Sequence, residues 1–88
     1  MKRIEKKTWP PYFQYILDGK KNYELRLADW GCQEGDILVL KEYDPKTKKY
    51  TGRVLEKEVA YVGKFKIDDL FFSPEEIKKH GLQIISLK

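Results

Sequence analysis

The chain is poor in the residues that most often make covalent cross-links and metal sites. Its 88 residues include one cysteine, Cys32, and one histidine, His80. A single cysteine cannot form an internal disulfide, and no metal-ligand spacing surrounds either residue. We therefore expect no metal and no cofactor, with Cys32 as a small buried residue and His80 as the last residue of a helix.

Long apolar runs are also missing. No run approaches the roughly 18 to 20 residues that a membrane-spanning helix needs, and the first residues lack the apolar segment of a signal peptide. We expect a cytoplasmic protein in a reducing compartment, without a membrane partner. The sequence also lacks a phosphate loop and a nucleophile elbow, so these motifs give no argument for catalysis.

What the chain does contain is mixed charge and enough apolar residues for a core. Eighteen basic and fourteen acidic residues give a net charge of +4, which permits a polyanionic partner without demanding one. The content of 41% hydrophobic and 14% aromatic residues argues against disorder. A chain of this length suits one domain with a modest core, so we predict a single domain over residues 1–88 and a monomer.

Two helices are predicted from spacing and capping residues. One apolar stripe at helical spacing is expected to face the core, formed by Trp9, Phe13, Ile16 and Leu17. The prolines after Trp9 suit the first turn of that helix. Ser73 is a good N-cap for the second helix, and Glu76 completes a capping box with it.

Short strands fill most of the remaining chain. The uninterrupted apolar run 37–40 predicts a strand covered on both faces. The turn-prone, entirely polar segment 44–49 predicts the tip of a long hairpin. We expect a loop at 29–35 and strands at 2–7, 22–27, 36–43, 53–65 and 82–87. Five or six strands with two helices indicate a mixed α+β domain.

The segment from Gly19 to Arg26 carries the strongest functional signal. Gly19 can adopt the left-handed conformation that ends a helix, which brings Lys21 beside the next element. Glu24 and Arg26 are two residues apart and share one face of the predicted strand. The opposite face then carries Tyr23, Leu25 and Leu27. This alternation predicts a half-buried strand with a small charged platform at its start.

The spacing G-x-K-x-x-E-x-R in this segment resembles the signature of the ASCH superfamily, small relatives of the PUA RNA-binding domain. The fixed positions are matched by Gly19, Lys21, Glu24 and Arg26. Further landmarks of a small prokaryotic branch of that superfamily span residues 1 to about 65, at 9–13, 35–40, 44–45 and 50–53. The resemblance implies a closed or nearly closed PUA-like β-barrel of about five or six strands.

The resemblance also implies a cleft beside the barrel where RNA or a nucleotide binds. Lys21 and Arg26 would contact phosphate or a base edge, and Glu24 would accept hydrogen bonds from a base or orient the two cations. The candidate contacts in this segment are Gly19, Lys20, Lys21, Glu24 and Arg26. The alternative is a surface ion pair between Glu24 and Arg26, with a stabilising contribution of about 0 to 1 kcal/mol.

Two further features are candidate RNA contacts. On the predicted hairpin, basic and aromatic residues interleave in a way that suits single-stranded RNA: Tyr43, Lys46, Lys48, Lys49, Tyr50 and Arg53. The alternative is a solvated hairpin tip. Trp30 is either a stacking platform for an unpaired base or a plug at the end of the barrel.

Whether the chain is an enzyme stays open at this point, although the absence of known catalytic motifs favours a binding module. One ASCH branch of similar size hydrolyses the acetyl amide of N4-acetylcytidine with a lysine and a threonine three positions later. Lys21 matches the lysine, but Glu24 stands where the threonine is expected. Glu24 would have to act as a general base for water while Lys21 stabilises an oxyanion. A protein-interaction domain is the third alternative.

Overall fold

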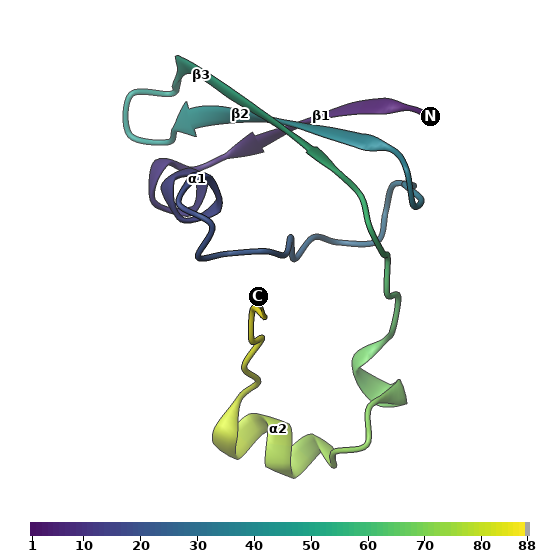
Figure 1. Cartoon of the computed structure of the whole chain (residues 1–88). Helices are drawn as coiled ribbons and strands as arrows, with labels where there is room; N and C mark the ends of the chain where they lie inside the picture. Colours follow the sequence, from purple (N-terminus) through teal and green to yellow (C-terminus); the bar gives the residue numbers. More distant parts are fainter. Residues whose placement is uncertain (88) are drawn as a thin grey trace.

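The computed structural model describes residues 1–87 as a small α+β structure with two α-helices and an open sheet of three strands (Figure 1). The elements in chain order are β1 (Arg3–Thr8), α1 (Pro10–Leu17), β2 (Ile37–Asp44), β3 (Lys49–Glu58), the 3₁₀ turn η1 (Ile67–Asp69) and α2 (Pro74–His80). No helix among the described residues is long and apolar enough to cross a membrane.

β2 is the central strand of the sheet. It pairs in parallel with β1 on one side and antiparallel with β3 on the other. Leu38, Val39 and Leu40 are all buried although successive side chains of a strand point to opposite faces. The prediction of a strand covered on both faces is therefore confirmed.

α1 lies against one face of this sheet, and its packing forms the core. Phe13 and Ile16 are buried on its inner side, as their spacing predicted. The prediction is wrong for Trp9 and Leu17, which are 52% and 49% exposed at the two ends of the helix. Ile16 joins a cluster of buried residues with Leu38, Leu40 and Val59. Cys32 is partly buried and packs against this cluster.

A buried carboxylate ties the start of β1 to the start of β2. The Asp36 side chain is 1% exposed and accepts hydrogen bonds from the backbone N–H groups of Lys2 and Gln33, each at 2.9 Å. The Lys2 bond and then the Gln33 bond hold the pKa of Asp36 below its usual value, because both stabilise the charged form. Asp36 thereby holds the preceding loop against the start of β2.

The β2–β3 hairpin turns where the polar segment predicted it, but its returning strand is Lys49–Glu58 rather than residues 53–65. Pairing begins directly after the turn because Tyr50 lies opposite Tyr43. The register then shifts, and Gly52 adopts a φ of +97° at that irregularity. Glycine adopts this positive φ readily because it has no Cβ atom, and such residues are common at strand irregularities.

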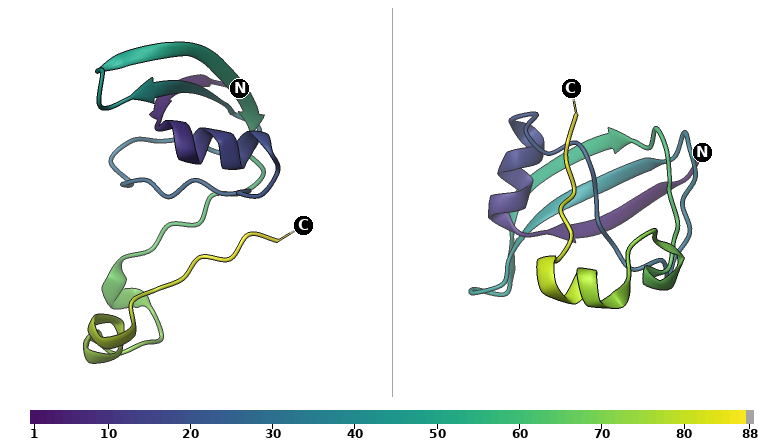
Figure 2. Two further views of the ribbon diagram at one scale, coloured as in Figure 1. Left: turned by 90° about the vertical axis from the view of Figure 1, so that its left-hand side faces the viewer. Right: turned by 90° about the horizontal axis from the view of Figure 1, so that it is seen from below.

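The predicted strands at 22–27 and 82–87 are wrong, and the described residues do not form the closed barrel of five or six strands. Residues 22–27 run beneath the sheet instead of pairing with an edge (Figures 1 and 2). Leu25 and Leu27 are 67% and 80% exposed, so the expected half-buried face does not exist. Apolar and polar residues do alternate in this segment, but no neighbouring strand of the described chain pairs with its backbone N–H and C=O groups.

Residues 65–87, which we call the arm, extend from the sheet and α1 (Figure 2). α2 begins as predicted: the Ser73 hydroxyl accepts from the Glu76 N–H, and the Glu76 carboxylate accepts from the Ser73 N–H, both at 3.2 Å. His80 is in its last turn, also as predicted. No residue of α2 is buried.

Candidate ligand-binding site

The charged residues of the segment after α1 form one compact ion-pair cluster. Glu24 lies between two cations: its Oε1 is 3.2 Å from Lys21 Nζ, and its Oε2 is 2.8 Å from Arg26 Nε. The three side chains are 16% (Lys21), 17% (Glu24) and 31% (Arg26) exposed. We call Lys21, Glu24 and Arg26 the cationic cluster because its net charge is positive. Glu24 and Arg26 lie together as an ion pair, although not on the predicted strand, and Lys21 joins them.

Backbone contacts hold this cluster against the end of β1. Gly19 has a φ of +77° directly after α1, as its role in ending the helix predicted. The N–H of Lys21 then bonds to the Tyr15 carbonyl at 3.1 Å. On the other side, Arg26 Nη2 donates to the Lys7 carbonyl at 2.9 Å. The loop is thus fastened by α1 at one end and by β1 at the other.

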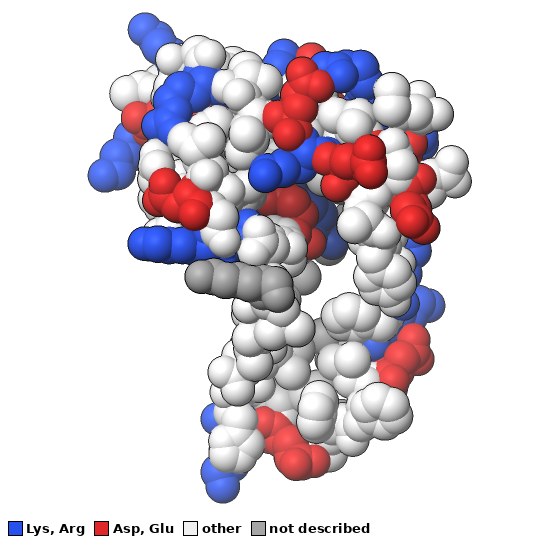
Figure 3. All heavy atoms as spheres, in the orientation of Figure 1, with Lys and Arg blue, Asp and Glu red and all other residues white. Residues whose placement is uncertain are grey.

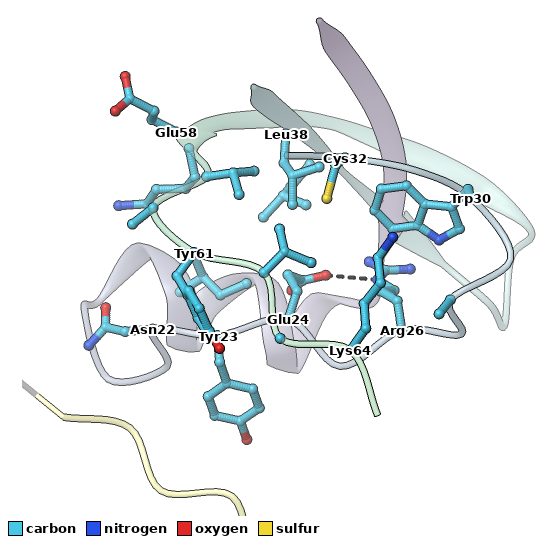
Figure 4. A pocket seen from close by; sticks show the side chains of 18 of the residues that line it. Asn22, Tyr23, Glu24, Arg26, Trp30, Cys32, Leu38, Glu58, Tyr61 and Lys64 are labelled. Carbon is cyan, nitrogen blue, oxygen red and sulfur yellow. Dashed lines mark hydrogen bonds and ion pairs between the residues drawn. The ribbon is translucent and has the colours of Figure 1, made fainter. Parts of the chain in front are cut away.

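The cluster forms part of the wall of a cavity of about 560 Å³ between this loop and the sheet, which we call the inner cavity (Figure 4). Its apolar lining comes from the core, with Ile16, Leu38, Leu40 and Val59. Its polar lining includes Asn22, Glu58, Tyr61 and Lys64 besides the cluster. An apolar cavity of this size with a few convergent polar groups is typical of a small-molecule site.

Trp30 lines the inner cavity, and its ring is in contact with a cation. Lys6 Nζ is 3.9 Å from the centroid of its ring, which is within the range of a cation–π contact. Trp30 also packs against the core cluster. Because the sheet does not close into a barrel, Trp30 does not plug a barrel end; it remains a candidate stacking platform.

A second hollow lies on the other side of the cluster, with a volume of about 370 Å³. We call it the outer groove. Its lining repeats the cluster and Tyr23 and adds residues from the end of β1 and the start of α1: Lys7, Thr8, Trp9 and Tyr12, with Leu25. The cationic cluster is therefore a wall shared by two hollows.

None of the predicted hairpin residues lines either hollow. Tyr43 and Tyr50 pack edge to face with ring centroids 5.2 Å apart, and Lys7 Nζ is 4.4 Å from the Tyr43 ring. The remaining predicted hairpin contacts are exposed lysines: Lys46, Lys48 and Lys49. Neither hollow is lined by these lysines, or by Gly19 and Lys20. The structure thus does not join the hairpin lysines with the cationic cluster.

Arg53 is engaged by the protein itself. Its Nη2 donates to Gln14 Oε1 at 3.0 Å, and its Nε is 3.8 Å from the buried Glu42 carboxylate. Glu42 also accepts a hydrogen bond of 2.6 Å from the Thr51 hydroxyl. The irregularity at Gly52 lies between Thr51 and Arg53, and the side chains of both contact the buried Glu42 carboxylate.

The sequence-based predictions missed most of the lining of both hollows. Tyr61 and Lys64 follow β3, and no motif marks them. Trp9 and Tyr12 of the outer groove were interpreted as helix residues within a landmark of the resemblance, and Lys7 and Tyr23 as strand residues.

Charge is interspersed over the molecule, as Figure 3 shows, with acidic and basic side chains mixed on the face of the sheet and α1. Residues 1–87 contain no group of three or more His, Cys, Asp or Glu side chains placed to hold a metal ion. Within the described residues, the cationic cluster combines partly buried charge with a position on a cavity wall.

The fold and the site define a small α+β protein with a charged cluster between two hollows. A family model described as "Domain of unknown function (DUF3850)" matches residues 5–72, and the chain belongs to this family. Comparison with curated proteins and with solved structures finds no match.

Proposed function

We propose that the protein is an RNA- or nucleotide-binding module, an ASCH-type relative of the PUA domain, and that its ligand enters the inner cavity. The observation that carries this proposal is the position of Lys21, Glu24 and Arg26 on the cavity wall. The four matched positions of the G-x-K-x-x-E-x-R spacing also support it.

The cluster keeps hydrogen-bonding capacity for an anion. Lys21 Nζ uses two of its three protons, on the Tyr23 carbonyl and on Glu24. Arg26 uses Nε and Nη2, and within the described residues its Nη1 makes no hydrogen bond. Lys21 thus keeps one ammonium proton, beside the Tyr23 ring whose centroid is 4.5 Å from Nζ, and Arg26 keeps one guanidinium nitrogen. Both groups bind phosphate well.

The inner cavity suits a nucleobase. Its floor of core residues is apolar, and Trp30 offers a ring for stacking. Glu24 can accept a hydrogen bond from an exocyclic amine while the two cations balance its charge. A base in the cavity and its phosphate at the cluster would together use the polar groups of the cluster.

The test is a titration with single-stranded RNA across a salt series, followed by calorimetry. We expect Lys21→Ala and Arg26→Ala each to weaken binding and to reduce the slope of log affinity against log salt by about one unit. Lys20→Ala is the matched control, because Lys20 is the neighbouring lysine and lines neither hollow. No binding at low salt, or equal binding by all variants, would contradict the proposal.

An amidohydrolase acting on acylated nucleosides is a second candidate, favoured by the 3.2 Å contact between Lys21 Nζ and Glu24 Oε1 on the cavity wall. Glu24 would activate water and Lys21 would stabilise the oxyanion. This role predicts release of acetate from N4-acetylcytidine that is lost in Lys21→Ala and in Glu24→Gln. Absence of turnover on a panel of acylated nucleosides would remove this candidate.

A further inference from the structure

The two hollows are separated by a wall that both of them share. Lys21, Tyr23, Glu24 and Arg26 line the inner cavity and the outer groove alike. The free hydrogen-bonding groups of this wall, on Lys21 and Arg26, therefore lie at the boundary between two spaces. A ligand that occupied only the inner cavity would leave the second space unused.

The outer groove has its own aromatic surface. The rings of Trp9 and Tyr12 stack on each other, with centroids 6.5 Å apart and planes inclined at 27°. Both side chains remain about half exposed, at 52% and 49%. Lys7 also lines this groove, and its Nζ lies 4.4 Å from the Tyr43 ring centroid. An exposed aromatic pair beside a lysine suits the face of an unpaired base and an adjacent phosphate.

We infer that the ligand is a single-stranded chain of at least two nucleotides that crosses the cationic cluster. This inference rests on the proposed function. One base occupies the inner cavity, the neighbouring base stacks on Trp9 and Tyr12, and the phosphate between them contacts Lys21 and Arg26. The outer groove, at about 370 Å³, is within the size range of a small-molecule site.

The arrangement selects single strands over duplexes. Each hollow offers an aromatic ring and polar groups to one base, and a paired base in a duplex keeps its faces stacked on its neighbours. The cluster on the wall supplies the charge that follows the backbone, while the two aromatic sites supply stacking that tolerates different sequences. We therefore expect the protein to distinguish single strands from duplexes more strongly than it distinguishes one base from another.

The chain contains two tryptophans, and each hollow is lined by one of them: Trp30 in the inner cavity and Trp9 in the outer groove. Trp9→Phe therefore leaves a fluorescent reporter of the cavity alone, and Trp30→Phe leaves a reporter of the groove alone. Stacking of a base on either indole is expected to quench its emission.

The experiment titrates both reporter variants with the four ribonucleoside 5′-monophosphates and the four homodinucleoside monophosphates. We expect the mononucleotide to quench Trp30 and the dinucleotide to quench both tryptophans. We also expect the dinucleotide to bind about tenfold more tightly or better, because stacking of one more base strengthens binding by roughly this factor or more.

Tyr12→Ala and Tyr15→Ala provide a matched pair. Both tyrosines are on α1 and are similarly exposed, at 49% and 47%, but only Tyr12 lines a hollow. Tyr12→Ala is expected to abolish the advantage of the dinucleotide and to leave mononucleotide affinity unchanged. Tyr15→Ala is expected to change neither affinity, which separates stacking from general effects on the helix.

The outcomes distinguish this inference from the function beneath it. Equal affinity for mononucleotides and dinucleotides, with quenching of Trp30 alone, overturns the two-base arrangement and leaves nucleotide binding intact. Binding of duplex RNA as tightly as a single strand of the same length also overturns it. If neither ligand quenches either tryptophan or binds by calorimetry, both the inference and the proposed function fail.

Discussion

The body of the molecule, residues 1–64, and the arm, residues 65–87, use apolar residues in opposite ways. In the body, Phe13 and Leu40 are each 1% exposed. In the arm, Phe71 is fully exposed and Leu87 is 79% exposed, and α2 buries no residue. Within the described chain one hydrogen bond, from the Asn22 N–H to Ser86 Oγ, joins the arm to the body.

The difference shows that a helix in this protein can be defined by local interactions alone, without packing against the rest of the chain. α2 has a complete capping box and charges placed for the helix dipole, and these suffice to define its ends. The body instead depends on long-range burial between α1 and the sheet. Both hollows are lined only by residues up to Lys64, so the candidate site belongs to the body.

The largest expected effect comes from breaking the core of the body. Phe13→Ala should lower the free energy of unfolding by about 3 to 5 kcal/mol, because it removes a buried ring and leaves a cavity. The same change in the arm, Phe71→Ala, should alter it by no more than about 0.5 kcal/mol. Urea unfolding followed by circular dichroism measures both, and a large loss in Phe71→Ala would show that the arm is packed in solution.

The next effect concerns the buried carboxylate of β2. Thr51→Val keeps the shape of the side chain but removes the hydroxyl that donates to Glu42 at 2.6 Å. We expect a loss of about 1.5 to 3 kcal/mol, since the bond is made to a buried charged group. Thr47→Val, in the exposed hairpin turn, is the matched control and should be close to neutral. Comparable losses in the two variants would contradict the role assigned to the Glu42 contact.

The third prediction concerns acid stability. The pKa of Asp36 is lowered in the folded state, so its contribution to stability is complete above its unfolded value, near 4. That contribution is lost as the pH falls through the lower folded pKa, because the unfolded chain takes up the proton first. Unfolding curves between pH 6 and pH 2 should therefore be flatter for Asp36→Asn than for the parent.

Asp29→Asn, in the exposed loop before Asp36, is the control for that comparison. It should keep the steep loss of stability at acid pH. An Asp36→Asn protein with the same pH dependence as the parent would show that Asp36 does not supply it.

The smallest effect is expected in the arm. Ser73→Ala removes the side chain that caps α2 and should destabilise that helix by about 1 kcal/mol. Because the arm is nearly unattached, the unfolding midpoint of the body should stay the same. Hydrogen exchange is expected to speed up at the Glu76 amide and not in β2, and a shift of both together would show that the two regions unfold as one.

Much of the fold was predictable because its signals are local. Both helices, the central strand and the hairpin turn follow from spacing, capping residues and one apolar run. The predicted strands at 22–27 and 82–87 failed for one reason: alternation makes a strand possible, but a strand also needs a neighbour for its backbone groups. The charges of Glu24 and Arg26 were brought together nonetheless, since residues two apart also meet in an extended loop.

The candidate site was predicted in part. Sequence spacing identified Lys21, Glu24 and Arg26, but it also grouped them with the hairpin lysines, which lie elsewhere. It gave no sign of the outer groove, because Lys7 and Tyr12 come from two different elements. Arg53 was assigned to a ligand surface, whereas the structure engages it with Glu42 and Gln14.

By itself, then, the sequence determined where α1 and α2 begin and end, that β2 is buried, and which residues form the cationic cluster. These follow from interactions within a few residues along the chain. Only the tertiary structure decided that the cluster stands between two hollows, that Asp36 and Glu42 are buried with their partners, and that the arm is exposed. Burial depends on which distant segments meet, and a linear pattern does not specify that meeting.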